Sequence, residues 1–352
     1  MRIGLYGMPT SGKSYIMDRV DFMEVIVGSK LLRQFDPDFD TRDEAGREYD
    51  RRAVAQIMLS KDEFLMDGHY AFGDEIAFTE EEGEMYDVYL YLYIAPEILR
   101  ERMLLSSKNQ KYLKYDLNEW QNTEIRGLRE YCHTHDKDFY IIDNPTTFSS
   151  ENVDTVLAFL KDIKAGYSCA EFAKKCADAI LEESASDVIT LLDGDKTLTI
   201  EDSSNRAFGY TTHLYDGNFY TGYQAWKQNI EFETYSVHEP TAMPVSINKA
   251  VMDKLDNSSY ILTSGHATIW GFISRQLNVP FFCGHQMSAE TKYFITKILQ
   301  SNGRKVIAYG DGMNDYFMLR QADKGYLVSK RDGTVSRSLK GRDLGGLELV
   351  RT

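Results

Sequence analysis

Gly7-Met8-Pro9-Thr10-Ser11-Gly12-Lys13-Ser14, near the start of the chain, decides the fold of the first half. This stretch fits the pattern G-x-x-x-x-G-K-S of a phosphate-binding loop, the P-loop. An apolar run at residues 3–6 precedes it, and residues 15–20 after it are compatible with a helix. Because the pattern needs a strand before it and a helix after it, this context supports the assignment.

The residue types of this loop suit a nucleotide. Gly7 and Gly12 let backbone N–H groups approach phosphate oxygens, and Lys13 neutralises the charges of the outer phosphates. The hydroxyl of Ser14 can ligate Mg²⁺. We therefore expect the first half to bind ATP or GTP together with Mg²⁺, with ATP as the phosphate donor.

Apolar runs that end at polar loops recur along the first half, at residues 3–6, 64–66, 88–94 and 139–142. Segments of helix length separate these runs, and residues 151–164 are typical of a closing helix. Such runs predict buried parallel strands. We expect an α/β domain with a P-loop NTPase-type parallel sheet.

A second α/β pattern begins at residues 188–192 and continues at 260–262 and 305–309. Each run ends at a polar motif, and ligands in open α/β sheets bind beyond the carboxyl ends of the strands. We therefore expect a Rossmann-like domain whose motifs meet in one crevice. The aromatic-rich stretch from about 200 to 250 predicts a small helical cap inserted over that crevice.

Length and helical periodicity set the expected domain boundaries. A chain of 352 residues is too long for one ordinary core and suits two domains. Apolar side chains recur at helical spacing between residues 167 and 183, which predicts a packed helix rather than a loose linker. We expect a first domain at 1–164, a helical connector at 165–186 and a second domain at 187–352.

Charge and composition narrow the possible partners. The net charge of -14 disfavours extended binding to nucleic acid, because that affinity comes mainly from Lys and Arg on phosphates. Small phosphorylated ligands are the expected partners. No apolar run can span a bilayer and no signal peptide opens the chain, so we expect a cytoplasmic protein without a membrane partner. The four cysteines lack C-x-x-C spacing, which indicates reduced structural thiols.

Together with the P-loop, three further segments of the first half resemble the adenylate-kinase-like group of nucleotide kinases. These segments are VGSKLLR at 27–33, FLMDGHY at 64–70 and ILRER at 98–102. The resemblance implies that Asp67 orients Mg²⁺ through water, that Arg33 binds the phosphate acceptor and that Arg102 clamps the transferring phosphate. The last of these segments enters the region where those kinases have a lid, here residues 102–114, and this lid has no clear second arginine. Its basic candidates, each of which is equally well explained as a solvated charge, are Lys108, Lys111 and Lys114.

The segment 36–43 places several carboxylates shortly after the expected acceptor helix. A hydroxyl acceptor benefits from a general base, whereas a phosphate acceptor needs none. Asp36, Asp38 and Asp40 are candidates for such a base, since polynucleotide kinases keep theirs at this place. The alternative is an acidic surface loop with proline-fixed turns. A second acidic run, at residues 80–84, is expected to be a solvated turn.

Four motifs in the second half resemble those of haloacid dehalogenase (HAD) superfamily phosphatases, most closely the phosphoserine-phosphatase-like branch. They are DGDKT at 193–197, LTSGH at 262–266, Lys292 and GDGMND at 310–315. The second carboxylate of the first motif is a feature of the phosphatases that the dehalogenases lack. The resemblance therefore implies hydrolysis of a phosphomonoester.

The same resemblance assigns roles to individual residues. Asp193 would be the nucleophile that takes the phosphoryl group, and Asp195 the acid that protonates the leaving oxygen and then activates water. Lys292 would hold the aspartyl phosphate. The implied substrate-binding residues are Ser264, Gly265 and Thr197. Mg²⁺ prefers oxygen ligands, and the implied set is Asp193, the carbonyl of Asp195, Asp311, and Asp315 with Asn314 in support.

The aromatic side chains of the inserted stretch have two explanations. They either form the cap's own core or offer a platform on which a base could stack. The residues concerned are Phe208, Tyr210, Tyr215, Phe219, Tyr220, Tyr223 and Trp226. Three histidines of this half, His213, His266 and His285, lack ligand spacing and are expected to be structural.

These features predict a bifunctional enzyme. One domain would transfer phosphate from ATP to a small nucleotide-type acceptor, and the other would hydrolyse a phosphomonoester through an aspartyl phosphate. The combination resembles polynucleotide kinase-phosphatases, which add a 5′ phosphate and remove a 3′ phosphate. The polynucleotide hypothesis takes second place, because the acidic charge and the cap favour small substrates. In a third hypothesis, the P-loop domain only senses a nucleotide and gates the phosphatase.

Overall fold

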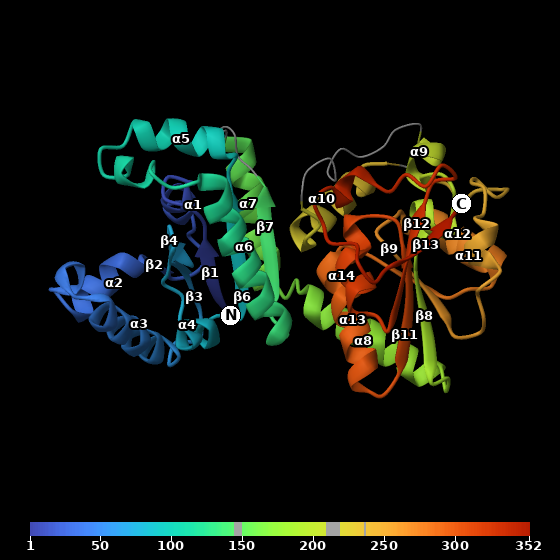
Figure 1. Ribbon diagram of the computed structural model, residues 1–352, viewed down its shortest axis with the longest axis horizontal. Coiled ribbons are helices and arrows are strands. Elements are labelled where there is room, and N and C mark those ends of the chain that lie inside the picture. Colours follow the sequence, from blue (N-terminus) through green and yellow to red (C-terminus); the bar gives the residue numbers. More distant parts are fainter. Residues whose placement is uncertain (144–149, 209–218, 236) are drawn as a thin grey trace. The chain divides into compact units, whose positions relative to one another are not determined.

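The computed structural model describes residues 1–143, 150–208, 219–235 and 237–352 (Figure 1). The chain folds into two compact units, Met1–Tyr167 and Ser168–Thr352, each with its own parallel sheet. The helical connector expected at 165–186 is a helix of the second unit, α8 (Cys169–Glu183), which packs against α13 (Ala289–Ser301).

The first unit is built on a five-stranded sheet with the order β2-β3-β1-β6-β7. All neighbouring strands are parallel. The strands are β1 (Arg2–Tyr6), β2 (Val25–Ile26), β3 (Phe64–Asp67), β6 (Val88–Tyr93) and β7 (Asp138–Asp143). Most of their residues are buried, as expected of a parallel sheet covered by helices, although both residues of β2 are only half-buried. The four strands predicted from apolar runs are confirmed, whereas the two-residue β2 is too short to predict.

Helices and a small hairpin complete this unit. The helices are α1 (Lys13–Met17), α2 (Gly28–Phe35), α3 (Glu44–Met58), α4 (Glu80–Met85), α5 (Pro96–Leu104), α6 (Leu117–Thr134) and α7 (Ser150–Lys164). The hairpin consists of β4 (Ala71–Phe72) and β5 (Glu75–Ile76). Side chains of Asp43, Thr79 and Asp116 cap α3, α4 and α6 by accepting backbone N–H groups. Helix α1 is shorter than the predicted 15–20 segment.

The second unit contains a six-stranded sheet with the order β10-β9-β8-β11-β12-β13, again parallel throughout. Its strands are β8 (Val188–Asp193), β9 (Ser259–Thr263), β10 (Phe281–Cys283), β11 (Lys305–Gly310), β12 (Lys324–Ser329) and β13 (Glu348–Arg351). The order reverses between β8 and β11, so the carboxyl ends of these two strands border the crevice in which such sheets bind ligands. The Rossmann-like α/β class predicted from the sequence is confirmed.

The remaining helices of the second unit surround this sheet and the inserted stretch. They are α9 (Ser203–Phe208), α10 (Gly222–Glu233), α11 (Lys249–Met252), α12 (Ala267–Leu277) and α14 (Met313–Gln321). Helix α10 of the inserted stretch contacts α13. Tyr210, His213 and Tyr215 lie outside the described residues.

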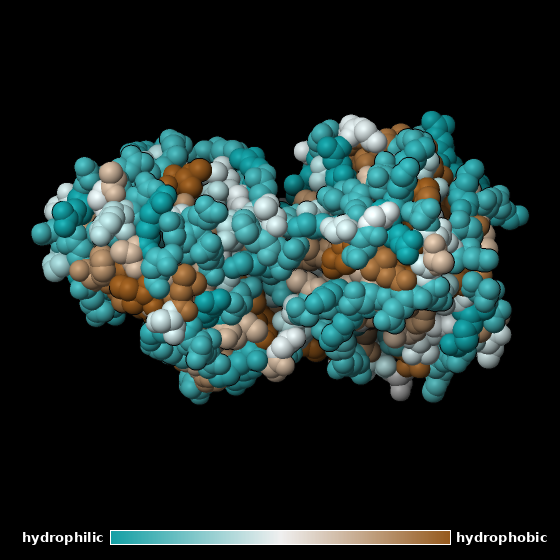
Figure 2. Space-filling view, turned by 90° about the horizontal axis from the view of Figure 1, so that it is seen from below, coloured by the Kyte–Doolittle hydropathy of each residue, from teal (hydrophilic) through white to brown (hydrophobic). Residues whose placement is uncertain are grey.

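On the face shown in Figure 2, hydrophilic residues cover most of the surface and apolar residues form separate patches. Within the described parts of the chain, no helix combines the length and the apolar character needed to cross a membrane.

Candidate active sites

The P-loop connects the end of β1 to the start of α1 in the first unit. Gly7 and Gly12 adopt φ angles of 144° and 108°, which side chains rarely tolerate. A Cβ atom on Gly7 would also lie 2.8 Å from the carbonyl oxygen of Leu92. The buried hydroxyls of Thr10 and Ser11 have no hydrogen-bond partner among the described residues. Unpaired donors in a glycine-shaped loop fit an anionic phosphate group.

Lys13 is the buried cation of this loop. Its Nζ donates to the carbonyl oxygens of Gly7 and Met8. Burial lowers the pKa of Lys13 to about 8, although the charges of Asp67 and Glu124 act against that change. Ser14 lies exposed on the first turn of α1, where its hydroxyl is accessible to a metal ion.

Asp67 ends β3, the neighbour of β1, and thus stands beside the P-loop. Its Oδ1 accepts the backbone N–H of Gly28 at 2.8 Å, which ties the start of α2 to the end of the sheet. Arg102 on α5 reaches the loop from the other side, where its Nη1 donates to the carbonyl oxygen of Thr10 at 3.3 Å. The structure therefore brings Asp67 and Arg102 to the P-loop, where the sequence predicts them.

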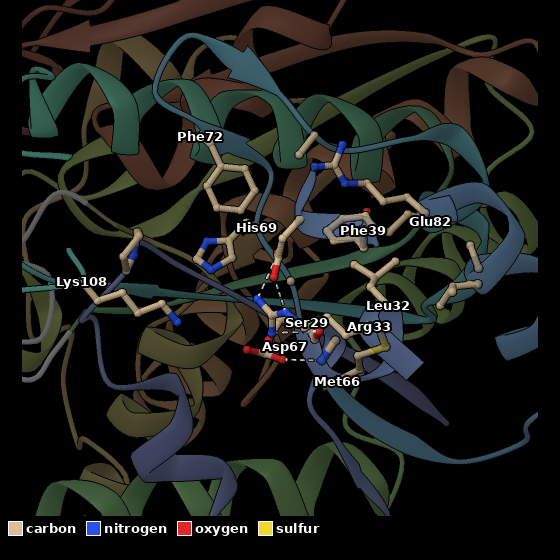
Figure 3. A pocket seen from close by; sticks show the side chains of 18 of the residues that line it. Ser29, Leu32, Arg33, Phe39, Met66, Asp67, His69, Phe72, Glu82 and Lys108 are labelled. Carbon is tan, nitrogen blue, oxygen red and sulfur yellow. Dashed lines mark hydrogen bonds and ion pairs between the residues drawn. The ribbon is translucent and has the colours of Figure 1, made fainter. Parts of the chain in front are cut away.

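A cavity of about 330 Å³ lies next to the loop and is lined by Pro9, Asp67 and residues of α2, α3 and the lid (Figure 3). Its apolar wall consists of Leu32, Phe39, Val54, Ala55, Met66, Phe72, Ala77, Met85 and Tyr112. Its charged residues are Arg33, Asp40, Arg51, Asp67, Glu82, Lys108 and Lys111. Lys108 and Glu82 lie on opposite sides of the cavity, with His69 and Asp67 between them (Figure 3). A small acceptor in this cavity would face the P-loop.

Some of the cationic side chains in the cavity are paired with an acid of the described chain, and others are not. Arg33 is held by Asp40 through two hydrogen bonds, from Nε at 2.7 Å and from Nη2 at 3.2 Å. Arg51 forms no salt bridge or hydrogen bond with the described residues, and burial lowers its pKa. Lys108 and Lys111 line the cavity, whereas Lys114 does not. The cavity therefore offers free positive charge to an anionic acceptor.

The three candidate bases of the 36–43 segment have different surroundings in the structure. Asp36 binds Arg42 Nε at 2.6 Å and caps the backbone of Asp38, and neither Asp36 nor Asp38 lines the cavity. Asp40 does line it, but its carboxylate is engaged by Arg33. Asp36 and Asp38 thus belong to a salt-bridged turn, as the alternative interpretation has it.

The prediction of a solvated turn at residues 80–84 is wrong. These residues form the first turns of α4, and Glu82 lines the cavity while accepting the Tyr6 hydroxyl at 2.6 Å. Burial raises the pKa of Glu82 to about 7, so that the acid is largely protonated below neutral pH. A signal was present in the sequence, because Thr79-Glu80-Glu81-Glu82 has the spacing of a capping box.

Two further residues of the first unit escaped the sequence analysis. Glu124 on α6 is fully buried and accepts from the hydroxyl of Tyr91 at 2.7 Å and the N–H of Ala71 at 3.2 Å. Burial raises its pKa, and the charge of Lys13 opposes the rise. The ring of His69 lies tilted against that of Phe72 in the cavity wall, with centroids 4.9 Å apart, and its buried Nδ1 has no hydrogen-bond partner among the described residues. No motif spacing marks either residue.

In the second unit, three carboxylates converge at the carboxyl ends of β8 and β11. Asp193 ends β8, Asp311 follows β11 and Asp315 lies in the first turn of α14. One oxygen from each lies within 4.8 Å of the others. Burial, followed by the charges of Asp315 and Asp193, raises the pKa of Asp311 well above its usual range. Carboxylates that destabilise one another in this way fit a bound divalent cation, and an oxygen-only set suits Mg²⁺.

Lys292 on α13 is the buried counter-charge of this cluster. Its Nζ donates to Asp193 Oδ1 at 2.6 Å and to Asp315 Oδ1 at 2.7 Å. Burial alone would lower the pKa of Lys292, but the two carboxylates raise it above its usual value. The other Asp315 oxygen accepts the N–H groups of Asp311 and Gly312. Because both Asp315 oxygens have partners, Asp193 and Asp311 are the better placed to ligate a metal ion, with Asp315 in support.

Asp195 lies two residues beyond Asp193 and has a different environment. Its Oδ1 accepts the N–H of Ser203 at 2.6 Å, and its Oδ2 accepts the indole N–H of Trp270 at 3.4 Å. Burial, followed by the charge of Asp202, raises the pKa of Asp195 to about 6. A carboxyl group with a raised pKa can donate a proton near neutral pH. Trp270 is fully buried and has no motif that would have identified it.

Of the three substrate-binding residues predicted for this unit, Ser264 and Gly265 have partners within the protein. Ser264 Oγ donates to the carbonyl oxygen of Met287 at 2.6 Å and accepts from Asn314 Nδ2 at 3.0 Å. The N–H of Gly265 donates to Thr263 Oγ1. The hydroxyl of Thr197 is buried, and no partner for it lies within the described chain. A phosphate group would have to replace some of these bonds.

Of the candidate aromatic residues in the inserted stretch, three are buried in the described structure and Tyr220 is half-buried. Tyr223 and Trp226 are buried and stack with their ring centroids 6.1 Å apart, and Phe219 is also buried. His266 accepts the N–H of Thr268 and so caps α12, and His285 lies 3.2 Å from Glu233. These contacts agree with the interpretation of the aromatics as a core and of both histidines as structural.

Comparisons with known proteins give distant fold neighbours. No family model and no curated protein matches this chain. A shikimate kinase from Bacteroides thetaiotaomicron is 16% identical with a TM-score of 0.35, covering 47% of this chain and 98% of that one. A shikimate kinase from Aquifex aeolicus is 18% identical with a TM-score of 0.32, covering 47% and 100%. A HAD family hydrolase from Salmonella enterica is 13% identical with a TM-score of 0.31, covering 51% and 76%. At such low TM-scores, the fold class rests on the strand order of the two sheets.

Proposed function

We propose that this chain is a bifunctional enzyme with a kinase in its first unit and a phosphatase in its second. The observation that supports the proposal is that each unit brings together, at the carboxyl edge of its own sheet, several residues that the sequence predicts to handle phosphate. The P-loop, Asp67 and Arg102 meet in the first unit. Asp193, Asp311, Asp315 and Lys292 meet in the second.

For the phosphatase, Asp193 attacks the phosphorus atom and the ester oxygen leaves with a proton from Asp195. The resulting aspartyl phosphate is hydrolysed when water attacks it and Asp195 takes up the water proton, which restores both carboxyl groups. Lys292 neutralises charge next to Asp193. A Mg²⁺ ion held by Asp193 and Asp311 would supply further positive charge to the phosphoryl oxygens.

For the kinase, the P-loop binds the ATP phosphates, and Lys13 and Arg102 neutralise the charge that is transferred. Ser14 and Asp67 would hold Mg²⁺, directly and through water. The acceptor lies in the cavity beside Pro9 and Asp67. Its size of about 330 Å³ and its free cations support a small anionic acceptor such as a nucleoside monophosphate.

Two alternatives remain open to experiment. A polynucleotide kinase-phosphatase would need a base for its hydroxyl acceptor, and Asp36 and Asp38 lie outside the cavity. A nucleotide-sensing switch would bind ATP without transferring phosphate.

A substrate panel on the intact chain separates the three. ATP turnover is measured in the presence of Mg²⁺ under three conditions: with each nucleoside monophosphate, with a 5′-hydroxyl oligonucleotide, and without an acceptor. Hydrolysis of a phosphomonoester is followed in parallel. We expect transfer to a monophosphate together with Mg²⁺-dependent hydrolysis. Transfer to the oligonucleotide would favour the polynucleotide enzyme. ATP-dependent hydrolysis of the ester without phosphoryl transfer would favour the switch.

A further inference from the structure

A basic segment follows strand β12 in the second unit. Between residues 330 and 342 the cationic side chains are Lys330, Arg331, Arg337, Lys340 and Arg342. Asp332 is the single acid in this stretch, so five positive charges and one negative charge leave a net charge of +4. The whole chain carries -14, which makes this segment an exception. Such a local concentration of cations attracts anions.

The protein does not neutralise these cations itself. All five side chains are exposed, and none forms a salt bridge with another described residue. The nearest acid beyond the segment, Asp343, lies 3.6 Å from Arg320 instead. The side chain of Asp332 accepts the N–H of Thr334 within its own turn. The positive charge of the segment is thus available to a ligand.

The fold fixes the segment beside the phosphatase carboxylates. In the parallel pair β11 and β12, Gly310 is opposite Leu327, so the chain leaves the sheet at Lys330 on the edge where Asp311 lies. Farther along, Ser338 Oγ accepts the N–H of Met313 at 3.0 Å, two residues after Asp311. Leu339 is buried in the core.

Arg337 and Lys340 therefore flank Ser338 and Leu339, the two anchored residues, and Ser338 is bonded to the loop that carries Asp311. The three carboxylates, together with Lys292 and a bound Mg²⁺ ion, would bind a single phosphoryl group. The cations of the segment lie outside that cluster and would be of no use to a substrate with a single phosphate. They would complement a substrate with a second phosphate group, because long basic side chains bind phosphate oxygens at a rim.

From this placement we propose that the phosphatase acts on a small phosphomonoester that carries at least one further phosphate group, and that Arg337 and Lys340 bind that group. The proposal rests on the phosphatase function of the second unit. It defines the substrate class of that site and assigns specificity to a segment that the four motifs do not include.

The test compares the intact wild-type protein with the double variant Arg337→Gln/Lys340→Gln in Mg²⁺ buffer. The matched control is Lys305→Gln/Lys324→Gln, which removes two exposed cations at the amino ends of β11 and β12, on the opposite edge of the sheet. Three substrates are used: p-nitrophenyl phosphate, a nucleoside 3′,5′-bisphosphate and a 3′-phosphorylated oligonucleotide. Thermal unfolding of each variant checks that it is folded.

We expect kcat/KM for the bisphosphate to fall by about ten-fold or more in the Arg337/Lys340 variant, mainly through KM, since two exposed charge contacts are lost. Hydrolysis of p-nitrophenyl phosphate should stay within about two-fold, as should all activities of the control. The proposal would be overturned if kcat/KM fell equally for the bisphosphate and p-nitrophenyl phosphate, or if it fell for neither. It would also be overturned if kcat/KM fell for the oligonucleotide alone. If the wild type hydrolyses none of the three, the phosphatase function fails and the proposal with it.

Discussion

Lys292 Nζ lies 2.6 Å from Asp193 Oδ1, in a position that no solvent reaches, and this contact joins two residues 99 positions apart in the chain. A buried ammonium and a buried carboxylate are stable only as a hydrogen-bonded pair. The pair also fixes the orientation of Asp193, because Oδ1 is held and Oδ2 is left for other partners. The same contact therefore orients Asp193, the proposed nucleophile.

The lid lysines provide a test of the acceptor cavity with a built-in control. Lys108 and Lys111 line the cavity, and Lys114, three residues farther on, does not. Lys108→Ala and Lys111→Ala should each raise KM for an anionic acceptor by about five-fold to thirty-fold, because one charge contact is lost. Lys114→Ala should change it by less than about two-fold. Similar effects in all three variants would show that the lysines act only through the overall charge. Initial rates of ATP-dependent transfer give these values.

Substitution of the three carboxylates after α2, Asp36, Asp38 and Asp40, tests whether the acceptor is a hydroxyl or a phosphate group. A base that removes a proton from a hydroxyl acceptor typically contributes on the order of 100-fold to 10,000-fold in rate. Asp36 and Asp38 lie outside the cavity, so their change to Asn should reduce transfer by less than about ten-fold. Asp40→Asn should act mainly on the acceptor KM, because it releases Arg33. A loss of about 100-fold at any one of the three, with ATP binding unchanged, would favour a hydroxyl acceptor instead.

Glu82 should make the stability of the first unit depend on pH. In the folded protein its pKa is about 7, against 4.5 for the ordinary group. Between these values the folded chain holds a proton that the unfolded chain has lost, so stability falls as the pH rises. Glu82→Gln should therefore gain about 1 to 3 kcal/mol relative to wild type between pH 5 and pH 8.

The control for this prediction is Glu84→Gln, an exposed position on the same helix. Urea unfolding at both pH values gives the free energies of unfolding. A difference between Glu82→Gln and wild type that is independent of pH would mean that Glu82 ionises normally in the folded protein.

Trp270 is expected to position Asp195. Trp270→Phe removes the indole N–H that lies 3.4 Å from Asp195 Oδ2, and it preserves most of the buried ring. The lost hydrogen bond favours the protonated form of Asp195, so the basic limb of the pH profile for hydrolysis should move to higher pH. The maximal rate should fall about three-fold to five-fold, because Asp195 loses a hydrogen bond that orients it. Phe272→Leu, on the same helix and in the same hydrophobic cluster but without a hydrogen bond to Asp195, should leave the pH profile in place.

The fold was largely predictable because most of its strands are buried and therefore appear as apolar runs. The short β2 and β10, and the hairpin after Gly68, were not, since two or three residues carry no periodicity. Strands β12 and β13 were also missed, and β13 is mostly exposed, so it forms no apolar run. The P-loop and the carboxylate cluster were predictable because their chemistry requires fixed spacings. Glu82 and Trp270 were missed, because their roles depend on contacts with Tyr6 and Asp195 from distant parts of the chain.

The two-site proposal is tested most directly by a crossed assay of Lys13→Ala, Asp193→Asn and wild type. ATP-dependent transfer to a nucleoside monophosphate and Mg²⁺-dependent hydrolysis of p-nitrophenyl phosphate are measured on the same folded preparations. Lys13→Ala should abolish transfer and leave hydrolysis within about two-fold, and Asp193→Asn should do the reverse, because an amide cannot attack phosphorus. Loss of hydrolysis in folded Lys13→Ala, or persistent hydrolysis in Asp193→Asn, would contradict two independent sites with Asp193 as the nucleophile.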